Sequence, residues 1–403
     1  MKRTLIAAVC LVVIASTCVR AQYSGAEVAS GPKMPVRTGA ACMEKYLPML
    51  TGKRVALCGN QTSVVGKTHL VDTLLARDVQ LVKLFCPEHG FRGQAEAGAT
   101  IASGKDALTG LPVVSLYGKN KKPTVEQLKD IDILLFDLQD VGCRFYTYIS
   151  TLHYVMEAAA ENHVKVIVLD RPNPNGFYVD GPVLKPQFKS FVGMHAVPVV
   201  YGMTIGEYAR MINGEKWLDN GLQCDLTVIP LEHYTHQTRY ALPVAPSPNL
   251  QTAESIYLYP SLCFFEGTNI SVGRGTDQPF EMYGAPLMQT GDYKFTPHAI
   301  PGVSENPPHK NQECRGFFLH EEAKKLMNNP TLLNLSYLMT AYQHYGDKEH
   351  FFINANFFDK LAGTDQLRKQ IVAGLPEKEI RDSWQEDLEK FKVVRERYLL
   401  YEE

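Results

Sequence analysis

The sequence lacks a strong net charge, and this absence removes one broad class of partner. Its 403 residues include 41 lysines and arginines and 43 aspartates and glutamates, which gives a formal charge of −2. A nearly neutral surface creates no general attraction to nucleic acid or to anionic membranes. We therefore expect no nucleic-acid partner.

The sequence also lacks a long hydrophobic run, and its start predicts export. No stretch approaches the roughly 20 apolar residues that cross a bilayer, so we expect no transmembrane segment. Lys2 and Arg3 precede an apolar run at 5–14, and a small-residue site at 19–21 follows. This is the layout of a secretory signal peptide over residues 1–21. Cys18 suggests lipid anchoring as the alternative, but the three residues before it match a leucine-rich lipidation box poorly. Soluble export, to the periplasm or the medium, is therefore favoured.

Paired cysteine motifs are missing. The chain has nine cysteines, of which Cys10 and Cys18 belong to the predicted signal peptide. The other seven are odd in number and widely spaced, without a C-x-x-C pair, so they do not form the pattern of a disulfide framework. Cys58 and Cys86 lie within apolar runs, and we interpret both as small core residues.

Several catalytic motifs are absent as well. The sequence has neither a G-x-x-x-x-G-K-[ST] loop nor a G-x-G-x-x-G motif, and so it lacks a nucleotide-binding signature. Residues 202–206 have the spacing of a G-x-S-x-G nucleophile elbow, but Thr204 stands at its centre. His233 and His236 have a spacing that could ligate zinc, but no third ligand is evident. We predict no metal and no cofactor.

What the sequence does contain is a repeated strand and helix pattern. Without the predicted signal peptide, the length allows two or three packed units, and the 45% of apolar residues can supply a sizeable core. Short β-branched runs alternate with helical patterns, at 54–58, 79–85, 111–116, 131–136 and 164–169. Continuous apolar strands of this kind predict an α/β fold whose parallel sheet is covered on both faces.

Polar clusters follow these runs. In parallel sheets, ligands bind outside the carboxyl ends of the strands. A turn after a strand requires only turn-forming residues. This chain instead has charged and polar residues at those ends, namely Glu88-His89, residues 137–140 and Asp170-Arg171. We therefore predict a functional site along this edge. Carboxylates, amides, arginines and tyrosines suit the cleavage of a glycosidic bond, although composition alone does not favour it over amide hydrolysis.

The second half of the sequence is less regular. We expect loops at 172–203 and 243–286, a helix at 204–218, a strand at 225–230, a mixed α/β pattern from 315, and closing helices at 364–373 and 376–398. Thr204 and Glu207 have the spacing of a helix capping box.

Segments throughout the chain resemble one family. They are GNQT at 59–62, PEHGFRG at 87–93, TGLPVVSLYG at 109–118, FDLQDVGCRFYTY at 136–148, LDRPNPNG at 169–176, GMTIGE at 202–207, SPNL at 247–250, EGTN at 266–269, GRGT at 273–276 and PFE at 279–281. In this order they resemble the exo-β-N-acetylmuramidase family of peptidoglycan hydrolases, from about residue 40 to the C-terminus. The family usually has Ala or Thr where Cys143 stands, and Thr-Asn at 58–59; neither change removes a polar candidate.

The resemblance implies an exo-acting glycoside hydrolase. Such an enzyme removes β-1,4-linked N-acetylmuramic acid from the non-reducing ends of peptidoglycan glycan fragments, during cell-wall turnover. It further implies a Rossmann-like catalytic domain, here at 40–245, and a smaller α/β domain at 246–403 that completes a cleft. Glycan fragments are the expected partner, and the sequence predicts no particular oligomeric state.

Glu88 is the first candidate for the catalytic acid, because it follows a strand at the predicted site. The alternative is a loop carboxylate paired with Arg92. An acid that works near neutral pH needs its pKa raised. Phe91 could do this as an apolar wall, and Asp137 or Asp140 as a nearby carboxylate.

The second catalytic group stays open between Asp140 and Glu266. The 2-acetamido group of the substrate is a third possibility, because some hexosaminidases use it. Asp137 could equally be a structural anchor.

The substrate contacts are expected from arginines, tyrosines and amides. The lactyl carboxylate of muramic acid predicts an arginine, and Arg92 or Arg144 is favoured over Arg171 and Arg274. Of the alternating Tyr146 and Tyr148, only one is expected to face the site. The remaining candidates are Asn60, His89, Asp137, Gln139, Asp170, Asn173 and Asn269, with Asn173 also suited to shaping a turn.

Three other classes of protein remain as alternatives. A non-catalytic peptidoglycan-binding module would keep the arginines and aromatic residues but would not need Glu88. An exported amidase or esterase would need a nucleophile or a metal. A structural cell-wall partner would not need so many polar groups at one sheet edge.

Overall fold

The structure is a computed structural model that describes residues 34–88, 90–91, 104–328 and 332–403. The predicted signal peptide lies outside these residues and stays a prediction. Residues Val36–Glu403 form one compact unit. Within the described ranges, every helix is too short or too polar to span a membrane.

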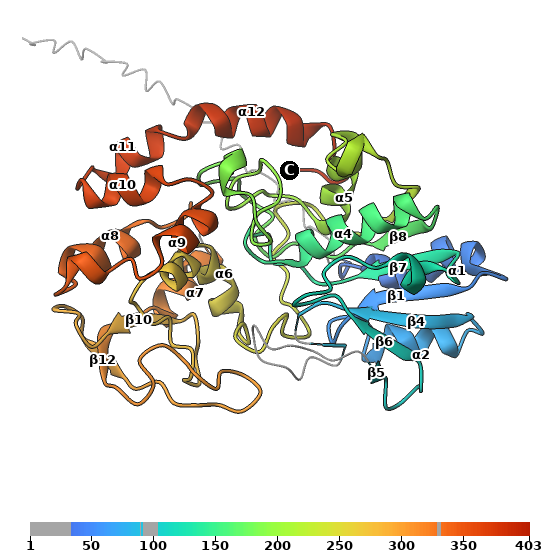
Figure 1. The fold of residues 1–403 in the computed structure, drawn as a ribbon, viewed down its shortest axis with the longest axis horizontal. Helices are drawn as coiled ribbons and strands as arrows, with labels where there is room; N and C mark the ends of the chain where they lie inside the picture. Colours follow the sequence, from blue (N-terminus) through green and yellow to red (C-terminus); the bar gives the residue numbers. More distant parts are fainter. Residues whose placement is uncertain (1–33, 89, 92–103, 329–331) are drawn as a thin grey trace, which may run out of the picture. The chain divides into compact units, whose positions relative to one another are not determined.

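The centre of the fold is a sheet of seven strands in the order β5-β6-β4-β1-β7-β8-β9 (Figure 1). The strands are β1 Val55–Gly59, β4 Leu81–Cys86, β5 Gly104–Lys105, β6 Pro112–Ser115, β7 Ile133–Asp137, β8 Lys165–Leu169 and β9 Leu226–Ile229. Each pair is parallel except β5 with β6. The order reverses at β1, as in a Rossmann-type sheet, whose ligands bind where the reversal opens a crevice. The predicted α/β fold is confirmed.

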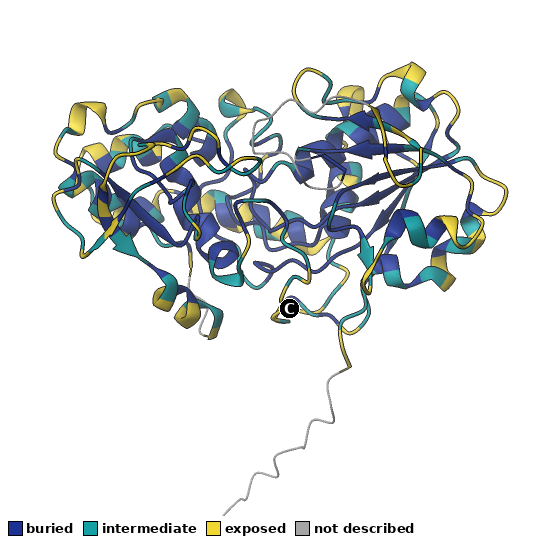
Figure 2. Ribbon diagram, turned by 90° about the horizontal axis from the view of Figure 1, so that it is seen from below, coloured by how far each residue is buried: buried dark blue, intermediate teal, exposed yellow. Residues whose placement is uncertain are grey.

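Alternate residues of the strands explain why helices cover both faces. Val55 and Leu57 join one core cluster with helices α1 Met43–Leu50 and α2 Leu70–Leu75. Ala56 and Cys58 join the other with α4 Tyr148–Glu161 and α5 Ile205–Gly214. Because successive side chains point to opposite faces, one apolar strand supplies both cores. The dark strands of Figure 2 show this burial on both faces.

Local sequence rules set the start of α5 and the state of the cysteines. Thr204 accepts from the backbone N–H of Glu207, whose side chain bonds back to Thr204, so the predicted capping box is confirmed. All seven cysteines of the described region are free and buried. Cys58 and Cys86 are core residues, as predicted.

The C-terminal half combines helices with a small antiparallel sheet. The sheet has the order β10-β12-β11, with β10 Met282–Ala285, β11 Tyr293–Phe295 and β12 Cys314–Phe318. The helices are α6 Ala253–Leu262, α7 His320–Asn328, α8 Ser336–His344, α9 Ala355–Ala362, α10 Gln366–Val372, α11 Glu377–Asp382 and α12 Gln385–Glu396. Short elements elsewhere are the hairpin β2 Val64–Val65 and β3 Thr68–His69, and helix α3 Val125–Leu128.

Two predictions about this half were wrong. Helix α6 lies where loops were expected. The expectation rested on the prolines of this segment, and one of them, Pro260, lies inside the helix. Its residues from Ser255 onward are buried, and a cap at Thr252 starts it, so packing outweighs the proline. The helix expected at 376–398 is in fact two helices, α11 and α12. Ser383 caps the end of α11, and the buried Trp384 directly precedes α12.

Candidate active site

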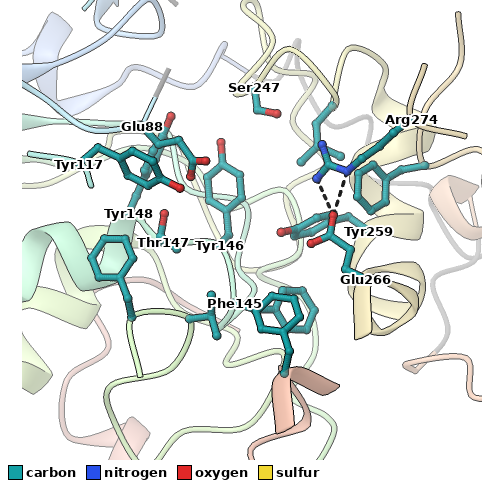
Figure 3. A pocket seen from close by; sticks show the side chains of 15 residues that line it. Glu88, Tyr117, Phe145, Tyr146, Thr147, Tyr148, Ser247, Tyr259, Glu266 and Arg274 are labelled. Atoms are coloured by element: carbon teal, nitrogen blue, oxygen red, sulfur yellow. Dashed lines mark hydrogen bonds and ion pairs between the residues drawn. The ribbon is translucent and has the colours of Figure 1, made fainter. Parts of the chain in front are cut away.

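A pocket of about 310 Å³ opens at the carboxyl edge of the large sheet (Figure 3). Its lining combines residues that follow the sheet strands with residues from the C-terminal half. The lining residues that the sequence had singled out are Glu88, Tyr146, Tyr148, Glu266 and Arg274. The structure therefore brings two predicted carboxylates, two predicted tyrosines and one predicted arginine into one cavity.

Strand register places Glu88 beside Tyr117. Strands β4 and β6 pair in parallel, with Cys86 opposite Ser115. Glu88 and Tyr117 each come two residues after this pair, where the two strands have left the sheet. They lie together on one wall of the pocket (Figure 3). Burial raises the pKa of Tyr117, and the charge of Glu88 and a hydrogen bond with it raise that pKa further. Tyr117 thus stays a hydrogen-bond donor next to the carboxyl group of Glu88.

Tyr146 and Tyr148 line the pocket where the chain enters α4, whose first residue is Tyr148. Their rings meet edge to face, with centroids 4.7 Å apart. Both hydroxyls donate to the backbone carbonyl of Pro246, at 2.9 and 3.3 Å. The prediction that only one would face the site was wrong, because the backbone before α4 turns instead of continuing as strand or helix. Asn60 donates to the Tyr148 hydroxyl at 2.7 Å, so it positions that tyrosine.

Glu266 and Arg274 form the opposite wall. Oε1 of Glu266 accepts from Nε of Arg274 at 3.0 Å and from Nη2 at 2.5 Å. Figure 3 shows this pair facing Glu88 and Tyr117 across the pocket. Glu266 belongs to the 3₁₀ helix η4 Cys263–Gly267, which packs on α9. A Cβ at Gly267 would lie 2.6 Å from Cα of Phe358, so only glycine allows this close approach.

The pocket walls between these groups are aromatic. They include Phe145, Tyr259 and Phe280, and the guanidinium of Arg274 lies 5.1 Å from the ring centre of Phe280. These residues, as well as Tyr117 and Ser247, were not among those predicted from the sequence. All except Tyr259 lie in the family motifs. From the sequence alone, however, an aromatic residue in a motif that lines a pocket cannot be distinguished from one that packs in the core. Tyr259 lies in α6, which was expected to be a loop.

Comparison with known proteins identifies the family. The model of "Exo-beta-N-acetylmuramidase NamZ, N-terminal" matches residues 55–254, and that of the C-terminal part matches 257–401. The chain belongs to the exo-β-N-acetylmuramidase NamZ family. A peptidoglycan β-N-acetylmuramidase NamZ from Bacillus subtilis (strain 168) is 42% identical over 393 residues, which cover 93% of each chain.

Two crystal structures of DUF1343 family proteins from Bacteroides fragilis NCTC 9343 are similar to this NamZ family member. One is 47% identical, with a TM-score of 0.83, over 92% of this chain and 99% of that chain. The other is 32% identical, with a TM-score of 0.78, over 92% and 100% of the two chains. The pocket takes Glu88, Tyr117 and Tyr146 from the segment matched by the N-terminal NamZ model. Tyr259, Glu266 and Arg274 come from the segment matched by the C-terminal model.

Arg144 is buried outside the pocket of this NamZ family member, so the structure does not support its favoured role in substrate binding. Its guanidinium is fully buried and donates to the backbone carbonyls of Pro182, Val197 and Leu361, at 2.7–2.8 Å. It is absent from the pocket lining. Burial lowers the pKa of Arg144 to about 9. The side chain therefore links loops of the sheet domain to the end of α9.

The predicted Asp137, Asp170 and Arg171 are also structural. Arg171 forms a buried two-pronged ion pair with Asp137, at 2.6 and 2.8 Å. Asp170 accepts from the Thr204 hydroxyl and the Gly206 amide, both at 2.7 Å, and so caps the start of α5. Burial raises the pKa of Asp170 to about 7. None of the three lines the pocket.

The predicted amides hold loops together. Gln139 donates to the carbonyls of Asp140 and Pro172. Asn173 donates to the carbonyl of Met203 and accepts from the Asn175 amide, as expected of a residue that shapes a turn. Asn269 bonds Phe351 and His309 through its backbone. These loops are buried, and buried backbone groups need partners, so polar residues at the sheet edge serve the loops as well as the pocket.

Three further residues singled out in the sequence are His89, Arg92 and His236. His89 and Arg92 lie outside the described residues, so their predicted roles stay predictions. His236, considered above as half of a zinc pair, is buried and bonds Glu207 at 3.1 Å.

Asp140 lies beneath the pocket and does not line it. Its Oδ2 accepts from the Gly142 amide at 2.6 Å and from the Tyr201 hydroxyl. Oδ1 is buried without a hydrogen-bond partner among the described residues. Burial raises the pKa of Asp140 to about 6. This carboxyl group therefore holds the loop after β7, and direct action on a sugar in the pocket is not favoured.

The Asp140→Asn variant is expected to remove a pH dependence of stability. The folded pKa of Asp140, about 6, exceeds its ordinary value of 3.8, so the folded state keeps a proton that the unfolded state releases. The free energy of unfolding of the wild type, relative to the variant, should fall by up to about 3 kcal/mol as pH rises from about 4 to about 6. Above about pH 6 the difference should stay level. Urea unfolding of both proteins at several pH values measures this difference. A difference that is constant over that range would contradict the buried protonated state.

Proposed function

We propose that this chain is an exo-acting glycoside hydrolase that releases β-1,4-linked N-acetylmuramic acid from the non-reducing ends of peptidoglycan fragments. The observation that carries the proposal is the placement of Glu88 opposite the Glu266–Arg274 pair in one pocket. A relative named peptidoglycan β-N-acetylmuramidase shares 42% of its residues with the chain. A volume of about 310 Å³ is at the small end of ligand pockets, which suits a single terminal sugar.

Glu88 would supply the proton. Hydrolysis of a glycosidic bond needs an acid that protonates the leaving oxygen as the bond breaks. Once the proton has left, the carboxylate of Glu88 can accept the hydrogen bond of Tyr117, with which it interacts. Aromatic side chains line the pocket on either side of this group.

Glu266 would act from the other side of the sugar. Its Oε1 accepts from Arg274, and its Oε2 accepts only the weak hydrogen bond of the Cys263 thiol, at 4.0 Å. The carboxylate would face the oxocarbenium-like centre that develops at the anomeric carbon. Because Asp140 does not line the pocket, Glu266 is the better supported of the two predicted carboxylates. The acetamido group of the substrate remains the alternative second group.

Arg274 would recognise the lactyl carboxylate of muramic acid. It is the arginine among the described residues that line the pocket. Its Nε and Nη2 bond Glu266, and Nη1 has no hydrogen-bond partner among the described residues. An arginine binds a carboxylate through short charge-assisted hydrogen bonds, and N-acetylglucosamine has no carboxylate to offer.

The wild type is expected to release the chromophore from a chromogenic β-N-acetylmuramic acid glycoside and not from its N-acetylglucosamine analogue. Arg274→Ala should raise KM for the muramic substrate about 10- to 100-fold, because a hydrogen bond to a charged group contributes about 1.5–3 kcal/mol. Steady-state kinetics on both substrates measure the effect, with the exposed Arg77→Ala as the matched control. A folded wild type that cleaves neither sugar would overturn the function, and an unchanged KM in Arg274→Ala would overturn only the role of this arginine.

A further inference from the structure

A second hollow adjoins the pocket. This groove has a volume of about 560 Å³ and is lined by Gln61, Val244 and Val303, among others. Ser247 lines both the groove and the pocket. In Figure 3, Ser247 stands at the rim, between Glu88 on one side and Arg274 on the other. A ligand that passes this rim therefore lies partly in the pocket and partly in the groove.

The wall between the two hollows is held from both sides. From the pocket side, the Tyr146 and Tyr148 hydroxyls donate to the carbonyl of Pro246. From the groove side, Nε2 of Gln61 donates to the same carbonyl and to that of Ala245, both at 3.2 Å. Residues that line the pocket and a residue that lines the groove thus bind the same segment, Ala245-Pro246. These hydrogen bonds fix the position of the groove relative to the pocket.

We infer that the groove binds the leaving-group sugar, N-acetylglucosamine, while the pocket holds the muramic acid. This inference rests on the proposed function. In an exo-acting hydrolase, the bond that breaks joins the terminal sugar to the next one, and the acid must reach the oxygen between them. Glu88 and the rim residue Ser247 both line the pocket, so the acid faces the cavity into which the groove opens. The next sugar then lies on the groove side of that rim.

The lining of the groove suits a neutral sugar. None of the described residues that line it is charged. Val244, Pro248 and Val303 offer apolar surface for the C–H face of a pyranose ring. Oγ of Ser247 accepts from the Asn249 amide at 3.1 Å, which leaves its hydroxyl hydrogen as a donor to a ligand. A stem peptide carries carboxylates, and an uncharged groove would have to desolvate them without compensation. The lining therefore favours the acetamido sugar over the peptide.

The test compares two substrates that differ only in the group beyond the rim. The disaccharide of N-acetylmuramic acid β-1,4-linked to N-acetylglucosamine reaches the groove, whereas the leaving group of N-acetylmuramyl β-fluoride is a single atom. Val303→Trp fills the groove with an indole. It is expected to lower kcat/KM for the disaccharide about 30-fold or more, because binding energy from remote parts of a substrate supports catalysis. Hydrolysis of the fluoride should stay within about twofold of the wild type.

Controls make each outcome decisive. Val393→Trp, at a position that is 66% exposed on α12, should leave both substrates unchanged. Val244→Trp, on the same groove, repeats the test if Val303→Trp does not fold. Equal losses on both substrates in both groove variants, or no loss on either, would overturn the inference. If the wild type hydrolyses neither substrate, the proposed function itself fails, and that result differs from a failure of the groove alone.

Discussion

Glu88→Gln is expected to lower kcat on the muramic acid disaccharide about 10²- to 10⁴-fold, which is the usual contribution of a general acid. Glutamine has nearly the same shape and can still accept a hydrogen bond from Tyr117, but it has no proton to give. KM should therefore change little. Steady-state kinetics on the disaccharide measure both constants.

The dependence on the leaving group separates acid catalysis from a structural effect. A dinitrophenyl glycoside has a leaving oxygen that needs little protonation, so the same variant should lose far less activity on it. Glu126→Gln, at an exposed position of α3, is the matched control and should be fully active. If Glu88→Gln keeps full activity on the disaccharide, the acid lies elsewhere, and Glu266 becomes the first candidate.

Arg144→Met is expected to lower the free energy of unfolding by an order of 3–5 kcal/mol. Methionine fills much of the volume of arginine but donates no hydrogen bond. The buried carbonyls of Pro182 and Leu361 would lose the guanidinium as donor, whereas that of Val197 would keep the backbone amide of Leu184. Each unsatisfied buried group costs about 1–3 kcal/mol. Neighbouring loops can relax toward some of them, which is why the expected total is less than the full sum. Urea or thermal unfolding measures the loss.

A lysine at the same position tests the geometry of the contact. Arg144→Lys keeps the charge but replaces a planar fork by one compact ammonium, and it should recover only part of the lost stability. Arg77→Met, at an exposed arginine, should change stability by less than about 0.5 kcal/mol. A loss below about 1 kcal/mol in Arg144→Met would show that the carbonyls of Pro182 and Leu361 find other partners.

The sheet was predictable because its signal is local. A strand buried on both faces needs a continuous run of apolar residues, and β1, β7 and β8 have such runs at 55–58, 133–136 and 166–169. The capping box of α5 was visible for the same reason, since it needs only Thr204 and Glu207. Helix α6 was not predictable, because its proline argues against a helix and its stability comes from burial among segments distant in sequence.

The site was predictable in part. Glu88 and the tyrosines follow strands, and parallel strands bring their carboxyl ends to one edge. The same argument placed Asp137, Asp170 and Arg144 there, but the structure uses them to hold the loops. Sequence position shows which edge a polar residue reaches. Whether its side chain points into a pocket or toward a buried carbonyl depends on the path of the loop, and that path is set by distant contacts.

By itself, the sequence determined the α/β class, the edge at which the site lies, the family and the first acid candidate, because these follow from local periodicity and from motifs that keep their order. Only the tertiary structure decided that Arg274, and not Arg144, shares a pocket with Glu88, that Tyr117 interacts with this glutamate, and that a neutral groove adjoins the rim at Ser247. The physical reason is that each of these facts joins residues from separate segments, and their distances are fixed by packing between the segments and not by any pattern along the chain.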